Sequence, residues 1–448
     1  MPKSSSDPLR ITVLADSDTR WKWGALTARR ISPDVRLDAR LLRGRATPTT
    51  RQLAEIGIPA ESMREVTAAQ FLNETGRAGR DGRGGTEASA RTDGCDVVVL
   101  ACVGGTVQAM LHGLARAWEG SARRPVVVTG YVGVVYEKLA DGLLLRAGAD
   151  VVLANSAHDA QRFRDTYAGV GADTAGIVET ALPFLEGAPY EPSADRPFTV
   201  TFAVQPSAPE GRADRTYLAR RAVEHARRHP EREVLVKLRS KPGEHTTHIE
   251  EHPYQKLVAR LGPPANLRLA YGHMGEVLDR TDLLVTVSST AALESLHRSI
   301  PTAVLTDLGI REALGNHHFL GSGCFASWDQ LDEGRVPRAD PGWLAAQGVT
   351  AKERFGALRE RVTALAAADE LPPPAPYYTP LTAPGYLPGV LARHGLDAKG
   401  EPLPGAVTER EPSALRRALR DVARNSARTA YRQGVQRVAP VIRRWGQL

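Results

Sequence analysis

The stretch Asp282–Leu305 reads DLLVTVSSTAALESLHRSIPTAVL and decides the fold of this 448-residue chain. An apolar, β-branched run (282–287) enters a Ser-Ser-Thr turn, a helix-forming segment (291–298) follows, and Pro301 precedes a second apolar run (302–306). Two strands that are joined through a helix run parallel in one sheet. The stretch therefore predicts a β-α-β unit, the building block of a Rossmann-like domain.

The same alternation of apolar runs and helix-forming segments covers most of the chain. Five strand-like runs lie in the N-terminal part (10–15, 35–42, 95–102, 125–130 and 150–154). Five more follow it (198–204, 233–238, 266–270, 282–287 and 302–306). The predicted fold class is α/β, with two Rossmann-like parallel-sheet domains that face a cleft and a C-terminal basic helix.

The composition of the segments predicts four parts. We expect an N-terminal acceptor domain at 1–186, a nucleotide-donor domain at 187–350, a helix and Pro-rich segment at 351–411, and a basic amphipathic helix at 412–448. Inside the first domain, residues 76–94 contain six glycines and almost no apolar side chain. This composition predicts a flexible surface loop, and a lid or an acceptor-contacting loop is the alternative.

Charge and cysteine content restrict the class of protein. The chain has 58 Lys and Arg against 51 Asp and Glu, a formal charge of +7, and a pI of about 9.4. Its three cysteines cannot form a disulfide framework and show no C-x-x-C spacing. The polar N-terminus and the short apolar runs offer neither a signal peptide nor a membrane span. The expected location is cytoplasmic, with any membrane contact peripheral, at the inner face of the plasma membrane.

The Ser-Ser-Thr turn is the first candidate site. Ser288, Ser289 and Thr290 would place hydroxyls and backbone N–H groups where a strand becomes a helix, which suits a phosphate. Each of the three could instead simply cap the helix. Glu294 follows in the second turn, where its carboxylate can accept hydrogen bonds from two ribose hydroxyls. The turn therefore predicts a nucleotide site, with helix capping as the alternative.

This unit resembles the nucleotide-binding part of GT-B glycosyltransferases, and more distantly that of capsule, teichoic-acid and polysialyltransferase-like enzymes. Arg298-Ser299-Ile300-Pro301 stands where those enzymes have a G-x-P turn. A second likeness is VKLRSKPGE (236–244), which is similar to their K-x-H-P motif. The resemblance implies that Lys237, Arg239 and Lys241 meet the donor phosphate, although Lys241 replaces the motif's His.

The N-terminal part resembles a family of uncharacterised actinobacterial glycosyltransferases. Three segments carry this likeness (129–138, 143–146 and 149–159), and the likeness spans about residues 10–340. Taken together, the two resemblances imply transfer of a sugar, or a related group, from a nucleotide-activated donor to a cell-surface glycan or a lipid-linked acceptor, in polysaccharide biosynthesis of the cell envelope. The resemblance to the capsule and polysialyltransferase-like enzymes favours a CMP- or CDP-linked donor over a UDP-linked one. The nucleotide sugar is a substrate, so we expect no cofactor, and we expect no metal site.

An inverting transferase of this kind needs a general base for the acceptor hydroxyl. Asp16 and Asp18 follow the first predicted strand, and Glu137 follows a Gly-rich strand exit, so all three are candidate catalytic residues. For the two aspartates, turn formation and capping are the alternative. On the acceptor side of the cleft we expect Gly104, Gly105, Thr106 and Tyr131.

The C-terminal segment 413–448 contains nine Arg and one Asp, a formal charge of +8, which leaves −1 for residues 1–412. Arginines recur every four residues (416, 420, 424, 428 and 432), and a weakly apolar stripe lies beside them. Such a helix can lie on an anionic membrane surface. The alternative is a helix packed across the domains with a solvated Arg face. No nucleic-acid partner is expected, because no recognition motif accompanies the charge.

Two rival functions remain open from the sequence. A nucleotide-sugar 2-epimerase shares the two-domain fold and needs no acceptor. A non-catalytic membrane-surface binding protein would use the basic tail alone. Motifs for a P-loop or an α/β-hydrolase nucleophile elbow are not found in the sequence.

Overall fold

The computed structural model describes residues 8–44, 46–80, 94–134, 139–241, 244, 250–350 and 354–406. The described residues form two compact units. The first contains residues 8–184 and 354–406, and the second contains residues 185–350. The segment after residue 354, which the sequence analysis set apart, thus packs with the first unit. The basic C-terminal helix predicted at 412–448 and the base candidate Glu137 lie outside the described residues.

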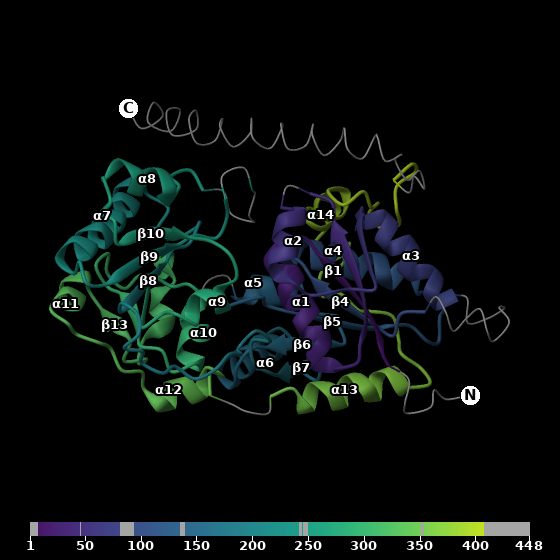
Figure 1. The fold of residues 1–448 in the computed structure, drawn as a ribbon. Coiled ribbons are helices and arrows are strands. Elements are labelled where there is room, and N and C mark those ends of the chain that lie inside the picture. The colour runs from purple at the N-terminus through teal and green to yellow at the C-terminus, as the bar shows by residue number, and fades with distance from the viewer. Residues whose placement is uncertain are drawn as a thin grey trace. The chain divides into compact units, whose positions relative to one another are not determined.

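A seven-stranded parallel sheet organises the first unit (Figure 1), in the order β3-β2-β1-β4-β5-β6-β7. Its strands are β1 (Arg10–Ala15), β2 (Arg36–Leu42), β3 (Ser62–Val66), β4 (Val97–Ala101), β5 (Val126–Gly130), β6 (Val151–Ala154) and β7 (Ile177–Glu179). Strands β1, β4, β5 and β6 are almost wholly buried, as expected for a sheet with helices on both faces.

The helices of the first unit are α1 (Asp18–Ile31), α2 (Thr50–Ile56), α3 (Ala68–Arg80), α4 (Gly104–Ala117), α5 (Leu139–Leu144), α6 (Ala157–Gly169), α13 (Gly356–Ala367) and α14 (Leu387–Ala392). The Pro-rich segment contains α14, and Leu387, Val390 and Leu391 of this helix are buried in one core with residues of α4. The predicted loop 76–94 begins too early, since α3 continues to Arg80. A Cβ on Gly76 would lie 3.0 Å from Ala117 Cβ, so glycine there lets α3 approach α4.

A six-stranded parallel sheet organises the second unit, in the order β10-β9-β8-β11-β12-β13. The strands are β8 (Thr199–Ala203), β9 (Glu233–Lys237), β10 (Leu267–Ala270), β11 (Leu283–Thr286), β12 (Thr302–Leu305) and β13 (Phe325–Ala326). The helices are α7 (Arg212–Arg228), α8 (Tyr254–Arg260), α9 (Met274–Leu278), α10 (Ala291–His297), α11 (Trp328–Asp332) and α12 (Pro341–Ala346), with 3₁₀ turns η2 (Glu312–Leu314) and η3 (Asn316–Phe319).

Side chains that alternate along β9 decide which helices cover which face of this sheet. Val234 and Val236 belong to a large core with residues of α7, α8 and α11, whereas Leu235 packs with Val277 of α9. Successive strand residues point to opposite faces, so α9 lies on the face opposite to α7, α8 and α11.

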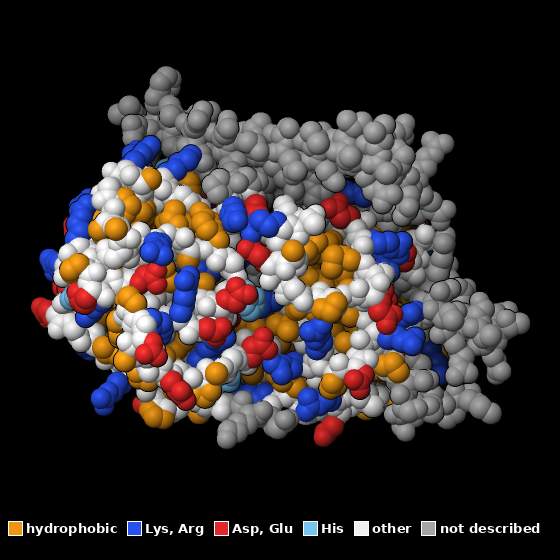
Figure 2. Space-filling model, in the orientation of Figure 1, with side chains coloured by type: hydrophobic (Ala, Val, Ile, Leu, Met, Phe, Trp, Pro, Cys, Tyr) orange, Lys and Arg blue, Asp and Glu red, His pale blue; other side chains and the backbone are white. Residues whose placement is uncertain are grey.

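Both units are parallel-sheet Rossmann-like α/β domains, and the predicted fold class is confirmed in that respect. Across the described ranges no helix is long and apolar enough to cross a membrane. On the face seen in Figure 2, basic and acidic side chains are interspersed rather than gathered by sign. This distribution agrees with the near-zero formal charge of residues 1–412.

Candidate functional site

Each sheet has one point where the strand order reverses direction. In the first unit the chain builds outward from β1 to β3 and then returns to add β4 on the other side of β1; in the second unit β8 and β11 have the same relation. At such a switch point the helices that follow the two strands leave in opposite directions, and a crevice opens at the carboxyl ends of the strands. The candidate sites are therefore the loops after β1 and β4, and those after β8 and β11.

Asp16 lies at the switch point of the first unit and is held by two donors. Its Oδ2 accepts a hydrogen bond from Val103 N at 2.9 Å, and its Oδ1 pairs with Arg20 Nη1 at 3.0 Å. Ser17 is the N-cap of α1, and Asp18 lies in the first turn, where the helix dipole favours a carboxylate. Both aspartates thus have the structural roles given as the alternative, and their catalytic role stays a prediction.

Of the predicted acceptor-side residues, Gly104 and Gly105 open α4. A Cβ on Gly104 would lie 2.7 Å from Leu145 Cδ1, so Gly104 packs closely against Leu145. A Cβ on Gly105 would meet no described atom within 4 Å. Thr106 is buried. Gly105 is therefore the residue of this group whose backbone a ligand can approach.

Tyr131 directly follows β5, and its ring packs against Arg146. Its ring centroid lies 4.0 Å from the guanidinium carbon of Arg146, and its hydroxyl donates a hydrogen bond to Leu139 O at 3.4 Å. Burial raises the pKa of Tyr131. The hydroxyl is thus a neutral, structurally engaged group.

Two residues of this edge were not predicted as site residues. Asn155, directly after β6, donates a hydrogen bond through Nδ2 to Tyr131 O at 2.8 Å, while its buried Oδ1 has no hydrogen-bond partner among the described residues. His394, after α14, has its pKa lowered by burial and by Arg393, and the charge of Asp16 acts in the opposite direction. A polar residue after a strand could have indicated Asn155, but no sequence pattern places His394 near Asp16.

In the second unit, Ser288 is a structural residue. It is 1% exposed, its N–H donates a hydrogen bond to Gln205 Oε1 at 3.0 Å, and its hydroxyl bonds Leu314 O and the same Gln205 atom. Gln205, which follows β8, thereby links the two strand ends of the switch point. No sequence pattern indicated this link.

The remaining residues of the turn differ in whether their side chains cap α10. Ser289 Oγ accepts a hydrogen bond from Ala291 N at 3.2 Å, as the capping alternative predicts. Thr290 is the N-cap residue of α10, yet its side chain makes no capping bond. Glu294 follows Thr290 by four residues, so both lie on one face of α10, and both are half-buried. Thr290 and Glu294 are the members of this set that best suit ligand contact.

The predicted phosphate-binding cations follow β9. Lys237 is its last residue and is buried, with Nζ donating a hydrogen bond to Leu238 O at 2.8 Å. Arg239 and Lys241 are exposed, and Lys241 Nζ lies 5.9 Å from the ring centroid of Tyr271. Strands β9 and β11 flank β8, so these cations and the turn after β11 are two strand spacings apart, about 10 Å.

Arg215 fixes the loops on this side of the second unit. The side chain is 1% exposed and forms an ion pair with Glu250. Its guanidinium also donates hydrogen bonds to four backbone carbonyls, those of Gln205 (3.1 Å), Pro206 (3.2 Å), Pro209 (3.0 Å) and His252 (2.7 Å). The loop after β8 is therefore built around one buried cation.

These features define a protein of two Rossmann-like units, each with polar groups at its strand-end switch point. The model of the family described as "Putative glycosyltransferase (DUF6716)" matches residues 11–365. The chain belongs to this family. No curated protein matches the sequence.

Solved structures of low sequence identity are similar to the chain. The UDP-GlcNAc 2-epimerase from Neisseria meningitidis, bound to UDP-GlcNAc, is 11% identical, with 80% of this chain and 98% of that chain covered and a TM-score of 0.43. A UDP-glucosyltransferase from Polygonum tinctorium is 12% identical, with 81% and 94% covered and a TM-score of 0.42. The UDP-GlcNAc 2-epimerase from Methanocaldococcus jannaschii is 11% identical, with 76% and 98% covered and a TM-score of 0.45.

Proposed function

We propose that the protein is a metal-independent glycosyltransferase that moves a sugar, or a related group, from a nucleotide-activated donor to a cell-surface glycan or a lipid-linked acceptor. Membership of the glycosyltransferase family over residues 11–365 carries this proposal. The two Rossmann-like units support it, because each offers a ligand edge.

The donor nucleotide would bind at the switch point of the second unit. Thr290 offers a hydroxyl that does not cap α10, and Glu294 offers a carboxylate to the ribose on the same helix face. Arg239 and Lys241 supply positive charge for the diphosphate from the loop after β9, and Lys237 lies at the end of that strand. These five residues carry the donor site in this proposal.

The acceptor would bind at the carboxyl edge of the first unit, beside Gly105. Asp16, Asp18 and Glu137 remain the proposed bases from the sequence, and His394 joins them. Both Asp16 oxygens are already engaged, whereas His394 has a lowered pKa and is therefore neutral and able to accept a proton at pH 7.

Nucleotide binding tests the donor site directly. CMP, CDP, UDP, GDP and TDP are each added at millimolar concentration in a thermal-shift measurement. A nucleotide present at 100 times its Kd stabilises the native protein by about 2.7 kcal/mol. If none of the five raises the melting temperature, the donor site does not exist.

Substitutions at the proposed contact residues test where the nucleotide binds. Glu294→Gln removes a charged acceptor, so the affinity should fall about tenfold or more. Thr290→Val removes the hydroxyl at nearly constant volume and should also weaken binding. Ser193→Ala, in an exposed loop of the same unit, is the matched control and should leave affinity unchanged. Equal affinities in all three variants would contradict the proposed placement.

Nucleotide release separates transfer from 2-epimerisation. A transferase should release free nucleotide from a donor sugar faster when an extract with the acceptor is added. An epimerase would convert the donor without any acceptor. His394→Gln, if His394 is the base, should lower kcat while nucleotide affinity stays the same.

A further inference from the structure

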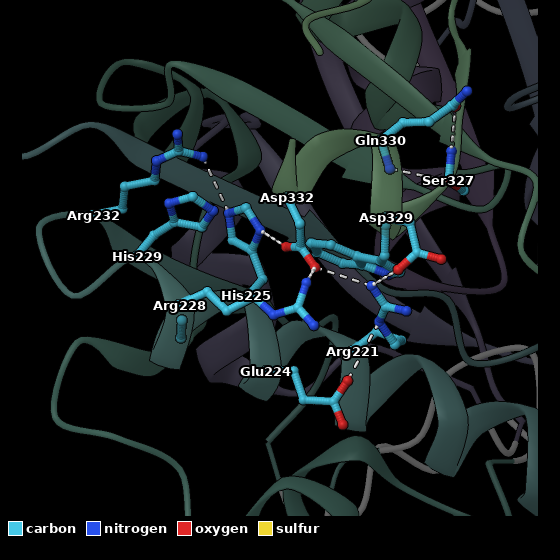
Figure 3. A network of polar contacts seen from close by, with 12 residues as sticks. Arg221, Glu224, His225, Arg228, His229, Arg232, Ser327, Asp329, Gln330 and Asp332 are labelled. Atoms are coloured by element: carbon cyan, nitrogen blue, oxygen red, sulfur yellow. Dashed lines mark hydrogen bonds and ion pairs between the residues drawn. The ribbon is translucent and has the colours of Figure 1, made fainter. Parts of the chain in front are cut away.

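A polar cluster joins the C-terminal end of α7 to α11 in the second unit (Figure 3). His225 and His229 are four residues apart at the end of α7, so they share one face of the helix. Asp332, the last residue of α11, reaches the same place, and Figure 3 shows the two imidazole rings side by side with the Asp332 carboxylate directed at His225. The cluster therefore combines two imidazoles and a carboxylate from two helices.

The spacing of these groups is close to that of metal ligands. One ligand atom from each of His225, His229 and Asp332 lies within 4.8 Å of the others. Tetrahedral zinc with ligand bonds of about 2.0–2.1 Å places its ligand atoms about 3.3 Å apart. His225 Nδ1 and Asp332 Oδ1 are 2.6 Å apart, so this pair would separate by about 0.7 Å, and the wider pairs would close by about 1.5 Å at most.

The hydrogen bonds of the cluster explain His225 but not His229. His225 is fully buried, its Nδ1 lies 2.6 Å from Asp332 Oδ1, and its Nε2 lies 3.4 Å from Arg232 Nη1. The Asp332 side chain is 3% exposed. His229 Nε2 is buried without a hydrogen-bond partner in the part of the chain that the structure describes, and leaving a buried polar atom unpaired is unfavourable. Its Nδ1 lies 3.3 Å from Glu231 Oε1. A carboxylate on one imidazole nitrogen is the arrangement that orients the other nitrogen toward a metal.

The net formal charge around the cluster is compatible with a bound cation. Arg221 and Arg228 already pair with Asp332, at 3.0 and 2.9 Å. Counted together, three arginines stand against four carboxylates, a sum of −1 when the histidines are neutral (Arg221, Arg228, Arg232, Glu224, Glu231, Asp329 and Asp332). A divalent ion would change this sum to +1. The carbonyl end of α7 also favours positive charge.

We propose that His225, His229 and Asp332 bind one divalent transition-metal ion of the zinc class, with water as the fourth ligand. The ion is structural and fastens α11 to α7. Strand β9 begins at Glu233, directly after this cluster, so the site lies at the amino edge of the sheet, away from the strand ends that carry the donor site. The ion thus takes no part in the transfer, and the proposal does not rest on the proposed function.

Cobalt(II) and zinc(II) titrations of the full-length, chelator-treated protein test this site. We expect one equivalent of either ion to bind, tetrahedral cobalt absorption to appear, and the melting temperature to rise on zinc addition. His229→Gln is the main variant, because His225 is wholly buried and its replacement can unfold the unit. His229→Gln should weaken zinc binding by about 100-fold or more, beyond the 10–100-fold that loss of an outer-shell partner causes.

His158→Gln is the matched control, since His158 is exposed on α6 of the first unit. This variant should bind zinc like the wild type. Two outcomes overturn the proposal: no saturable zinc binding to the wild type, or zinc binding that survives His229→Gln unchanged. Circular dichroism of the metal-free His229→Gln protein should match the wild type, which separates loss of a ligand from loss of the fold.

Discussion

Replacing Arg215 with methionine should be among the most destabilising single changes in the second unit. The guanidinium is 1% exposed, pairs with Glu250, and donates hydrogen bonds to four backbone carbonyls. Methionine keeps most of the apolar stem but leaves the Glu250 charge without its buried partner. Removing one member of a buried ion pair costs about 3–5 kcal/mol.

The carbonyls do not add a second cost of the same size, because the loop can open and let water reach them. We therefore keep about 3–5 kcal/mol for the whole change. For a unit of this size, 1 kcal/mol lowers the melting temperature by about 2–4 °C. The expected fall is thus roughly 6–20 °C for the transition of the second unit.

Urea unfolding followed by tryptophan fluorescence measures this loss, since Trp328 lies in the core of the second unit. Arg220→Met is the matched control: Arg220 lies on the same helix, α7, but is exposed, and its replacement should change the free energy of unfolding by less than about 0.5 kcal/mol. A loss below about 1 kcal/mol for Arg215→Met would refute the reasoning. Such a result would show that the desolvation penalty of the Arg215 guanidinium nearly cancels the stabilisation that its contacts provide.

Further predictions concern close packing, backbone strain, pH and thiol chemistry. Gly24→Ala should cost about 1–3 kcal/mol, because the new Cβ would lie 2.5 Å from Val13 Cγ1, whereas Gly105→Ala, with open space, should stay within about 1 kcal/mol of the wild type; urea unfolding compares them. Ser299→Gly should raise stability by up to about 1 kcal/mol in the same measurement, since Ser299 has φ 62°. Burial lowers the pKa of His112, so below about pH 6.5 the unfolded chain takes up a proton that the native protein does not. Stability should therefore fall from pH 7.5 to 5.5, less steeply in His112→Gln, and an unchanged slope would contradict this. Cys102 and Cys324 are buried, and burial raises the pKa of both thiols, so an aromatic disulfide at pH 8 should label neither of them before unfolding.

The strands of the sheet interiors could be predicted from sequence, because burial on both faces requires a continuous apolar run. The runs at β4, β5 and β11 are of this kind. Three strands could not be predicted. The sequence of β3 is SMREV and three of its five residues are exposed at the sheet edge, while β7 and β13 have only three and two residues. Edge strands that are this short or this exposed lack the continuous apolar run that identifies a strand buried on both faces.

The candidate site was only partly predictable, for a different reason. The sequence located the turn after β11, but it could not tell a ligand-facing hydroxyl from a structural one. That distinction depends on distant partners: Ser288 is engaged by Leu314 and Gln205, and Asp16 by the backbone of Val103. At the turn that departs from the G-x-P pattern, the residue type differs from the pattern while the backbone conformation agrees with it. Ser299 adopts the left-handed conformation that glycine favours, so the backbone of that turn suits glycine although the side chain differs.

Helix α7 shows why a basic sequence need not mean a basic surface. Six of its 17 residues are arginines, and Arg215, Arg221 and Arg228 have partners inside the unit. Near its start Arg215 is enclosed by the loop after β8, and near its end Arg221 and Arg228 both pair with Asp332. Each of these cations is thus already matched by carbonyls or carboxylates of the same unit. The excess charge that sets the pI lies instead in residues 413–448, so a partner attracted by charge would be expected there rather than on α7.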